Sequence, residues 1–64
     1  MNLVLKISIL QKYQSQADFA QMVGIRDDAL SRIIRGRRLP TDEEREKISQ
    51  FLRIPAAELF SSGH

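Results

Sequence analysis

The apolar residues between Gln16 and Arg35 recur three or four positions apart, as they do along one face of an α-helix. They fall into two groups, one on each side of Gly24. Before it lie Phe19, Ala20 and Val23, and after it lie Ile25, Leu30 and Ile33. A glycine suits an abrupt helix end because it adopts a positive φ without a Cβ penalty. Ala20 is small enough to let two backbones approach, and Ile25 can fill the turn. The pattern therefore predicts two short helices that meet at a tight corner, with their apolar faces toward each other.

The first 13 residues fit two different periodicities. A strand would place on one side Leu3, Leu5, Ile7 and Ile9. A helix would place on one face Leu3, Ile7, Leu10 and Tyr13. No second strand-like run is present to pair with the first, so we expect a helix from about Leu3 or Leu5 to Tyr13. A strand remains the alternative, as an edge for the pairing of two chains.

Two capping patterns mark further helix starts. Ser15 is followed by Asp18, and Thr41 by Glu44, the spacing at which a hydroxyl and an acid bond each other's backbone N–H. After the turn at Gly24 the next helix begins near Asp27, and a second glycine ends it. The expected helices span about 16–23, 27–35 with Gly36 as cap, and 42–52.

The last third of the chain supplies the rest of the expected core. The helix over about 42–52 has a buried stripe of Ile48, Phe51 and Leu52. Pro55 suits the first position of a short fifth helix, because its fixed φ is preorganised for a helix start. Leu59 and Phe60 would close the base of the core, and residues 61–64 would form a frayed tail.

Length and composition restrict the class of protein. Sixty-four residues form one small domain, residues 1–64, which buries only about 60% of its unfolded surface and has little room for a deep catalytic pocket. The chain has no cysteine and one histidine, so we expect no enzyme, no cofactor and no metal site. We find no membrane-spanning run and no signal-peptide pattern, and we expect a cytoplasmic protein. The prediction is an all-α, compact five-helix domain.

Charge is distributed unevenly although the net charge is only +2. Residues 26–38 carry five arginines against two aspartates, whereas residues 42–46 carry four acids against one arginine. We interpret the acidic run as an ordinary solvated helix face. The arginine cluster lies at the end of the presented helix, where it favours contact with nucleic-acid phosphates.

The ordered pattern resembles the helix-turn-helix of the phage lambda repressor and Cro type, found in xenobiotic-response-element-type regulators. The matching positions, in order, are Gln16, Ala20, Gly24, Ile25, Leu30 and Ile33. The helix-turn-helix core would span about 16–35, and the resemblance with its flanking helices covers nearly the whole chain. It implies a five-helix, lambda-repressor-like domain whose third helix enters the major groove of double-stranded DNA.

The resemblance also implies roles for individual residues. Base edges would be read by Asp27, Asp28, Ser31 and Arg32. Phosphates would be bound by Gln16, Arg26, Arg35, Arg37 and Arg38. Two departures matter: the acids at the helix tip either read bases or only stabilise the helix start, and a buried Arg–Glu pair frequent in the family is replaced at Ile9 and Ile34.

The leading hypothesis is a sequence-specific transcriptional regulator that acts as a homodimer on a palindromic operator. The alternative is a protein-interaction module of helix-turn-helix shape, whose acidic tip meets a basic protein partner. A dimer is inferred from the few contacts that one small domain makes. Its candidate surfaces are the run Leu3, Val4 and Leu5, and the region of Leu59 and Phe60.

Overall fold

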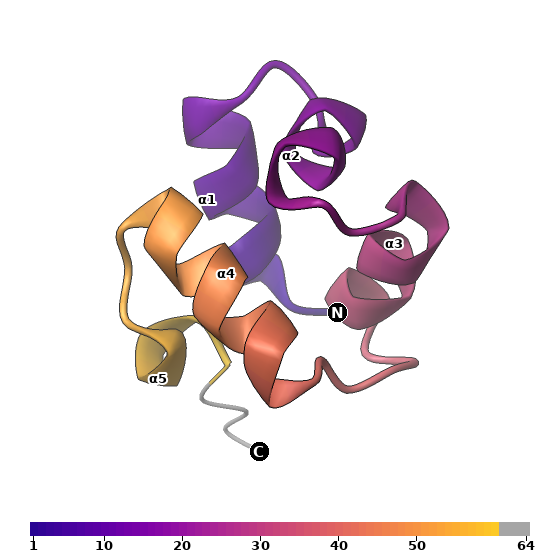
Figure 1. Ribbon diagram of the computed structural model, residues 1–64, viewed down its shortest axis with the longest axis vertical. Helices are drawn as coiled ribbons and strands as arrows, with labels where there is room; N and C mark the ends of the chain where they lie inside the picture. The colour runs from indigo at the N-terminus through magenta and orange to yellow at the C-terminus, as the bar shows by residue number, and fades with distance from the viewer. Residues whose placement is uncertain (61–64) are drawn as a thin grey trace.

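Five α-helices make up residues 1–60, the part of the chain that the computed structural model describes (Figure 1). Their bounds are α1 Leu3–Lys12, α2 Gln16–Val23, α3 Asp27–Arg35, α4 Asp42–Leu52 and α5 Ala56–Leu59. Those residues contain no strand, so the predicted all-α class with five helices is confirmed and the strand alternative at the N-terminus is wrong. The tail expected at 61–64 lies outside the described residues.

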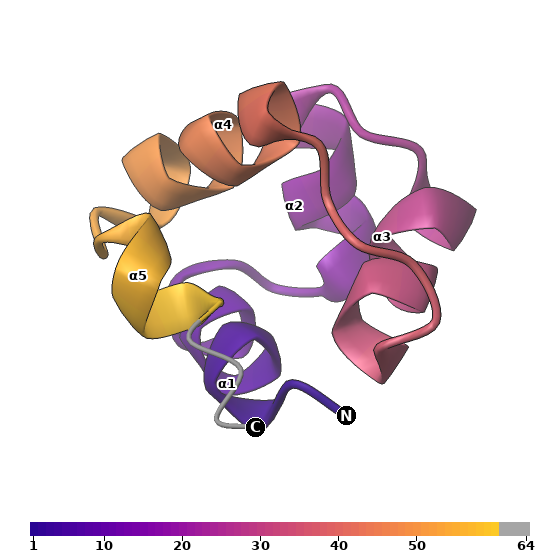
Figure 2. The same cartoon turned by 90° about the horizontal axis from the view of Figure 1, so that it is seen from below.

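The helices surround one core to which each of them contributes (Figure 2). Its buried apolar members are Leu5, Ile9, Phe19, Ala20, Val23, Ile25, Leu30, Ile33, Ile34, Ile48, Leu52 and Leu59. Phe19 is fully buried, and the ring of Tyr13 meets it edge-on with 4.9 Å between the centroids. This core fixes the mutual orientation of α2 and α3, on which the candidate site depends.

α1 packs through a different face from the one we predicted. Leu5 and Ile9 are buried with the small Ser8, whereas Leu3, Ile7 and Leu10 remain 57%, 52% and 50% exposed. α1 carries leucine and isoleucine on both sides, so periodicity alone does not choose between them. The helix ends at Lys12. The backbone of its cap, Tyr13, is extended, and the Tyr13 ring packs against Phe19.

Asn2 fixes the rotation of α1. Its side-chain oxygen accepts a hydrogen bond from the Leu5 N–H at 3.0 Å, and its amide nitrogen donates to the Leu59 carbonyl at 2.7 Å. Its backbone N–H donates to the Ile34 carbonyl at the end of α3, at 2.6 Å. One residue thus joins the start of α1 to α3 and α5, and Leu5 and Leu59 are buried beside it. Those two are therefore wrong as parts of a dimer surface.

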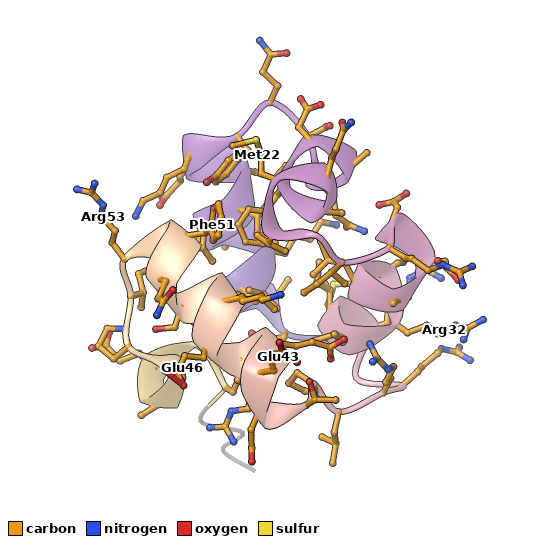
Figure 3. The ribbon with its side chains drawn as sticks, viewed as in Figure 1. Met22, Arg32, Glu43, Glu46, Phe51 and Arg53 are labelled. Carbon is orange, nitrogen blue, oxygen red and sulfur yellow. The ribbon has the colours of Figure 1, made fainter. Side chains whose placement is uncertain are left out.

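α4 begins as predicted, with both bonds of the Thr41–Glu44 capping box present. Ile48 and Leu52 are fully buried, but Phe51 is 38% exposed, so its place in the buried stripe is wrong. Its ring lies on the outer surface of α4, on the same side of the molecule as Met22 (Figure 3). Pro55 is the cap before α5 and not its first residue, a small correction to the predicted start.

Candidate nucleic-acid interface

The corner between α2 and α3 is built as the sequence predicts. Gly24 caps α2 with φ 77°, and its N–H donates to the Ala20 carbonyl, as does the N–H of Ile25 at 3.0 Å. A Cβ built on Gly24 would meet nothing within 4 Å. The positive φ, and not crowding, therefore makes glycine the favoured residue at this corner. Ala20 and Ile25 are both buried beneath it.

α3 turns its apolar side inward and its charged side outward. Leu30 and Ile33 are 0% and 4% exposed, and Ile34 is also buried. The outward side carries the four residues expected to read bases, of which Ser31 is half-buried and the others are exposed: Asp27, Asp28, Ser31 and Arg32. Arg32 projects from α3 away from the rest of the molecule (Figure 3). The predicted exposure is confirmed for Asp27, Asp28 and Arg32.

The acids at the tip of α3 are paired with neighbouring side chains. Arg26 approaches Asp28 with two nitrogens, Nε at 3.2 Å from Oδ1 and Nη2 at 3.4 Å from Oδ2. Gln16, at the start of α2, donates from Nε2 to Asp27 Oδ1 at 3.5 Å. Both acids also lie in the first helical turn, where a negative charge is favoured by the helix dipole. The tip therefore presents mixed polar groups in place of two bare carboxylates.

Three arginines near the end of α3 are exposed and unpaired. Within residues 1–60, the side chains of Arg32, Arg35 and Arg37 have neither an ion pair nor a hydrogen bond to another residue. Gly36 ends the helix with φ 79°, and the Arg37 N–H donates back to the Arg32 carbonyl at 2.9 Å. Among the described residues, α3 and the loop after it therefore present Arg32, Arg35 and Arg37 to solvent without a side-chain partner.

Arg38 lies in a different environment. Its Nη2 pairs with Glu44 Oε2 at 2.9 Å, while its buried Nη1 has no hydrogen-bond partner among the described residues. Partial burial raises the pKa of Glu44, but the Thr41 N–H and the Arg38 guanidinium outweigh it and hold that pKa below its ordinary value. This pair joins the loop after α3 to the start of α4, a connection that the sequence pattern did not indicate.

Gln16 occupies the N-terminal position of α2, beside the tip of α3. Ser15 caps this helix by accepting a hydrogen bond from the Asp18 N–H at 3.1 Å, as predicted, but among the described residues Asp18 makes no return bond to the Ser15 N–H. The first backbone N–H groups of a helix have no partner within it, so they can donate to an anion. Gln16 also lines a small hollow of about 100 Å³ with Lys6, Leu10, Ile9 and Ile34. The two isoleucines are buried and line it together.

Asn2 is the residue of this region that sequence reasoning missed. Its bond to the Ile34 carbonyl holds the C-terminal end of α3 against α1. Asparagine is a preferred N-cap residue, so Asn2, directly before the helix that begins at Leu3, was the available signal. Its longer-range partners lie too far along the chain for a local pattern to reveal them.

The family model for helix-turn-helix domains matches residues 6–59 of the chain. Searches of curated proteins and of solved structures returned no match. Within the described residues, no helix is long and apolar enough to cross a membrane. No three His, Cys, Asp or Glu side chains there are grouped to hold a metal ion. The match covers the corner, both helices beside it and nearly all of the core.

Proposed function

The chain belongs to the helix-turn-helix family of the lambda repressor and Cro type, a family of DNA-binding regulators, and from this premise we propose that it reads a palindromic operator as a homodimer. The observation that carries the proposal is the division of α3 into a buried side and a charged outward side. Leu30 and Ile33 anchor the helix, and the free guanidinium of Arg32 projects from it. This is the arrangement needed to place polar side chains against base edges in the major groove.

We assign base reading to the outward side of α3. The planar guanidinium of Arg32 is suited to two parallel hydrogen bonds with guanine O6 and N7. Ser31 lies next to it, and the carboxylates of Asp27 and Asp28 can accept from cytosine N4. Gln16 and Arg26 hold these carboxylates at 3.5 and 3.2 Å, which supports a role as oriented acceptors.

We assign phosphate binding to the groups that flank this side: Gln16, Arg26, Arg35, Arg37 and Arg38. Arg35 and Arg37 are exposed and have no competing partner among residues 1–60, so each is expected to contribute fully. Arg38 shares its charge with Glu44, and its contribution is expected to be smaller. Loss of one phosphate contact lowers the slope of log affinity against log salt by about one unit, without a change in base preference.

Selection of bound sequences from a random duplex pool tests the proposal. We expect a two-fold symmetric consensus, and an affinity that falls steeply as salt rises. Repeating the titration with Arg35→Gln should lower the salt slope while the consensus stays the same. A pool that yields no consensus, or an affinity that is flat in salt, would contradict the proposal.

A protein partner is the second candidate, favoured by the exposed carboxylates at the tip of α3. Their pairing with Arg26 and Gln16 reduces the acidity that such a partner would meet, so we rank this candidate second. Competition separates the two. Two results together would establish the second function: the chain fails to bind duplex at low salt, and a protein partner stays bound to it in excess duplex.

A further inference from the structure

α1 exposes an apolar side that the fold leaves uncovered. Leu3, Val4, Ile7 and Leu10 are 57%, 54%, 52% and 50% exposed, and they lie opposite the buried Leu5 and Ile9. We name these four residues the α1 outer face. They are half of the eight large apolar side chains exposed among residues 1–60, and no other helix there carries more than one.

We propose that the α1 outer face is covered by the same face of a second copy of the chain, in an antiparallel α1–α1 pair. This pair would be the dimer contact of the DNA-binding form, so the inference rests on the proposed function. It keeps Leu3 and Val4 of the dimer surface expected from the sequence and adds Ile7 and Leu10, whereas Leu5 and Leu59 are buried within the chain. Three observations support the choice of a second copy as the occupant.

The first observation is the area of the face. Four half-exposed aliphatic side chains leave about 400 Å² of apolar surface in water, within the range at which a patch on a small protein has a function. A symmetric pair would cover this area on both chains. With its polar margin it would reach the roughly 1,000 Å² that a specific interface needs. An interface at this lower limit of size is typical of weak, transient dimers.

The second observation is the spacing within the face. Leu3, Ile7 and Leu10 follow one another by four and three residues, the spacing of a coiled-coil seam. In an antiparallel pair Ile7 lies near the two-fold axis, against Ile7 of the second copy. Leu3 of each copy then meets Leu10 of the other. The seam is therefore complementary to itself, as a two-fold interface requires.

The third observation is the position of α1 relative to the candidate interface. Lys6 and Leu10 line one hollow with Gln16, whose side chain reaches the tip of α3. The residues proposed to contact DNA therefore lie beside the α1 outer face. α3 lies next to α1 in the fold (Figure 2). A two-fold axis that points toward DNA reverses the direction of α1 in the second copy. Both copies of α3 then face the same duplex, whereas a parallel pair would turn them to opposite sides.

This arrangement also predicts the operator spacing. Three helix-to-helix distances separate the two copies of α3, one across the pair and one within each chain. At 8–10 Å each, they place the two helices about 25–30 Å apart. One turn of the duplex is about 34 Å, so the pair fits half-sites one turn apart and not two.

Sedimentation equilibrium of the full chain, from about 1 μM to 1 mM, tests the pair. Ile7→Glu puts a charge at the centre of the seam, and we expect it to weaken the dimer at least 30-fold. Met22→Glu is the matched control, since Met22 is an apolar side chain 60% exposed on a different helix, α2. It should leave the dimer within twofold of the parent. A parent chain that stays monomeric at 1 mM, or equal weakening by both changes, would overturn the proposal.

Single-cysteine variants test the direction of the pair, because the chain has no cysteine of its own. Ile7→Cys should form a disulfide with itself. Leu3→Cys mixed with Leu10→Cys should form the mixed disulfide faster than either forms its own. Faster self-linking of Leu3→Cys would mean a parallel pair and would overturn the proposal.

Duplex binding by the same proteins separates this inference from the proposed function. If both hold, Ile7→Glu binds a single half-site like the parent but loses cooperative binding to the palindrome. A parent chain that binds duplex without pairing overturns the α1 pair alone. A chain that pairs through α1 but binds no duplex supports the pair and contradicts the DNA-binding function.

Discussion

α1 and α3 have nearly the same length and pack on the same core, yet they face the solvent in different ways. α3, of nine residues, buries Leu30, Ile33 and Ile34 and turns charged residues outward. α1, of ten residues, buries Leu5 and Ile9 and still exposes four apolar side chains on its other side. When one side of a helix is charged, the opposite side is the one that packs on the core. When both sides are apolar, the helix has two partners to pack against. For α1 these are the core and, as we propose, a second chain.

The largest expected effect tests which side of α1 belongs to the core. Leu5→Ala should lower the free energy of unfolding by about 3–4 kcal/mol, because Leu5 is fully buried and the change leaves a cavity. Leu3→Ala should lower it by less than about 1 kcal/mol, since more than half of Leu3 is already in water. Urea unfolding below the dimer concentration measures both. Equal losses of unfolding free energy would mean that both sides of α1 contribute equally to the core.

The next effect tests the link between the two helices. Asn2→Ala removes the cap of α1 and the bond to the Leu59 carbonyl, and we expect a loss of about 2 kcal/mol. Gln11→Ala is the control, because Gln11 is exposed on the same helix and should change stability little. Thermal or urea unfolding compares them. If Asn2→Ala were as mild as the control, Asn2 would not hold α1 against its neighbours.

A smaller effect tests the corner that orients α3. Gly24→Ala should cost about 1 kcal/mol, because alanine is strained at φ 77° while its Cβ meets no neighbour. Arg53 offers the reverse change, since it already adopts φ 59° without being glycine. Arg53→Gly should stabilise the chain by about 0.5 kcal/mol or more. Urea unfolding measures both changes. If Gly24→Ala and Arg53→Gly changed the free energy of unfolding in the same direction, this account would be contradicted.

The smallest effect concerns the loop that follows α3. Because the pKa of Glu44 is lowered in the folded chain, its contribution is complete above the ordinary glutamate pKa of 4.5 and is lost as pH falls through the lowered value. Glu44→Gln should therefore destabilise the chain at neutral pH and reduce the loss of stability between about pH 5 and 3. Glu46→Gln, at an exposed position of α4, should follow the parent curve. Parallel curves for Glu44→Gln and the parent would contradict the assigned pairing.

Local signals predicted most of the fold. The bounds of α2, α3 and α4 follow from Ser15, Thr41 and the two glycines that end α2 and α3. The side of α1 that packs could not be predicted in this way. Asn2 decides it through partners 32 and 57 residues away along the chain, and no local spacing records them.

The candidate site was predicted to a similar extent. The exposure of Arg32 and Arg35 follows directly from the buried positions of Leu30 and Ile33 on the same helix. The pairing of Arg38 with Glu44 did not follow, because it depends on how the loop between α3 and α4 folds back. Long side chains reach partners that helical periodicity does not specify. Spacing therefore predicts which side of a helix is presented, but not which of its charges remain free.

The most direct test of the central claim is duplex binding by Arg32→Gln beside Arg53→Gln. The two changes remove the same charge from opposite sides of the molecule (Figure 3). We expect Arg32→Gln to bind the selected operator about 10–100-fold more weakly and to relax preference at one base pair, while Arg53→Gln binds like the parent. If Arg32→Gln bound the operator like the parent, or if both variants lost affinity equally, α3 would not be the reading helix.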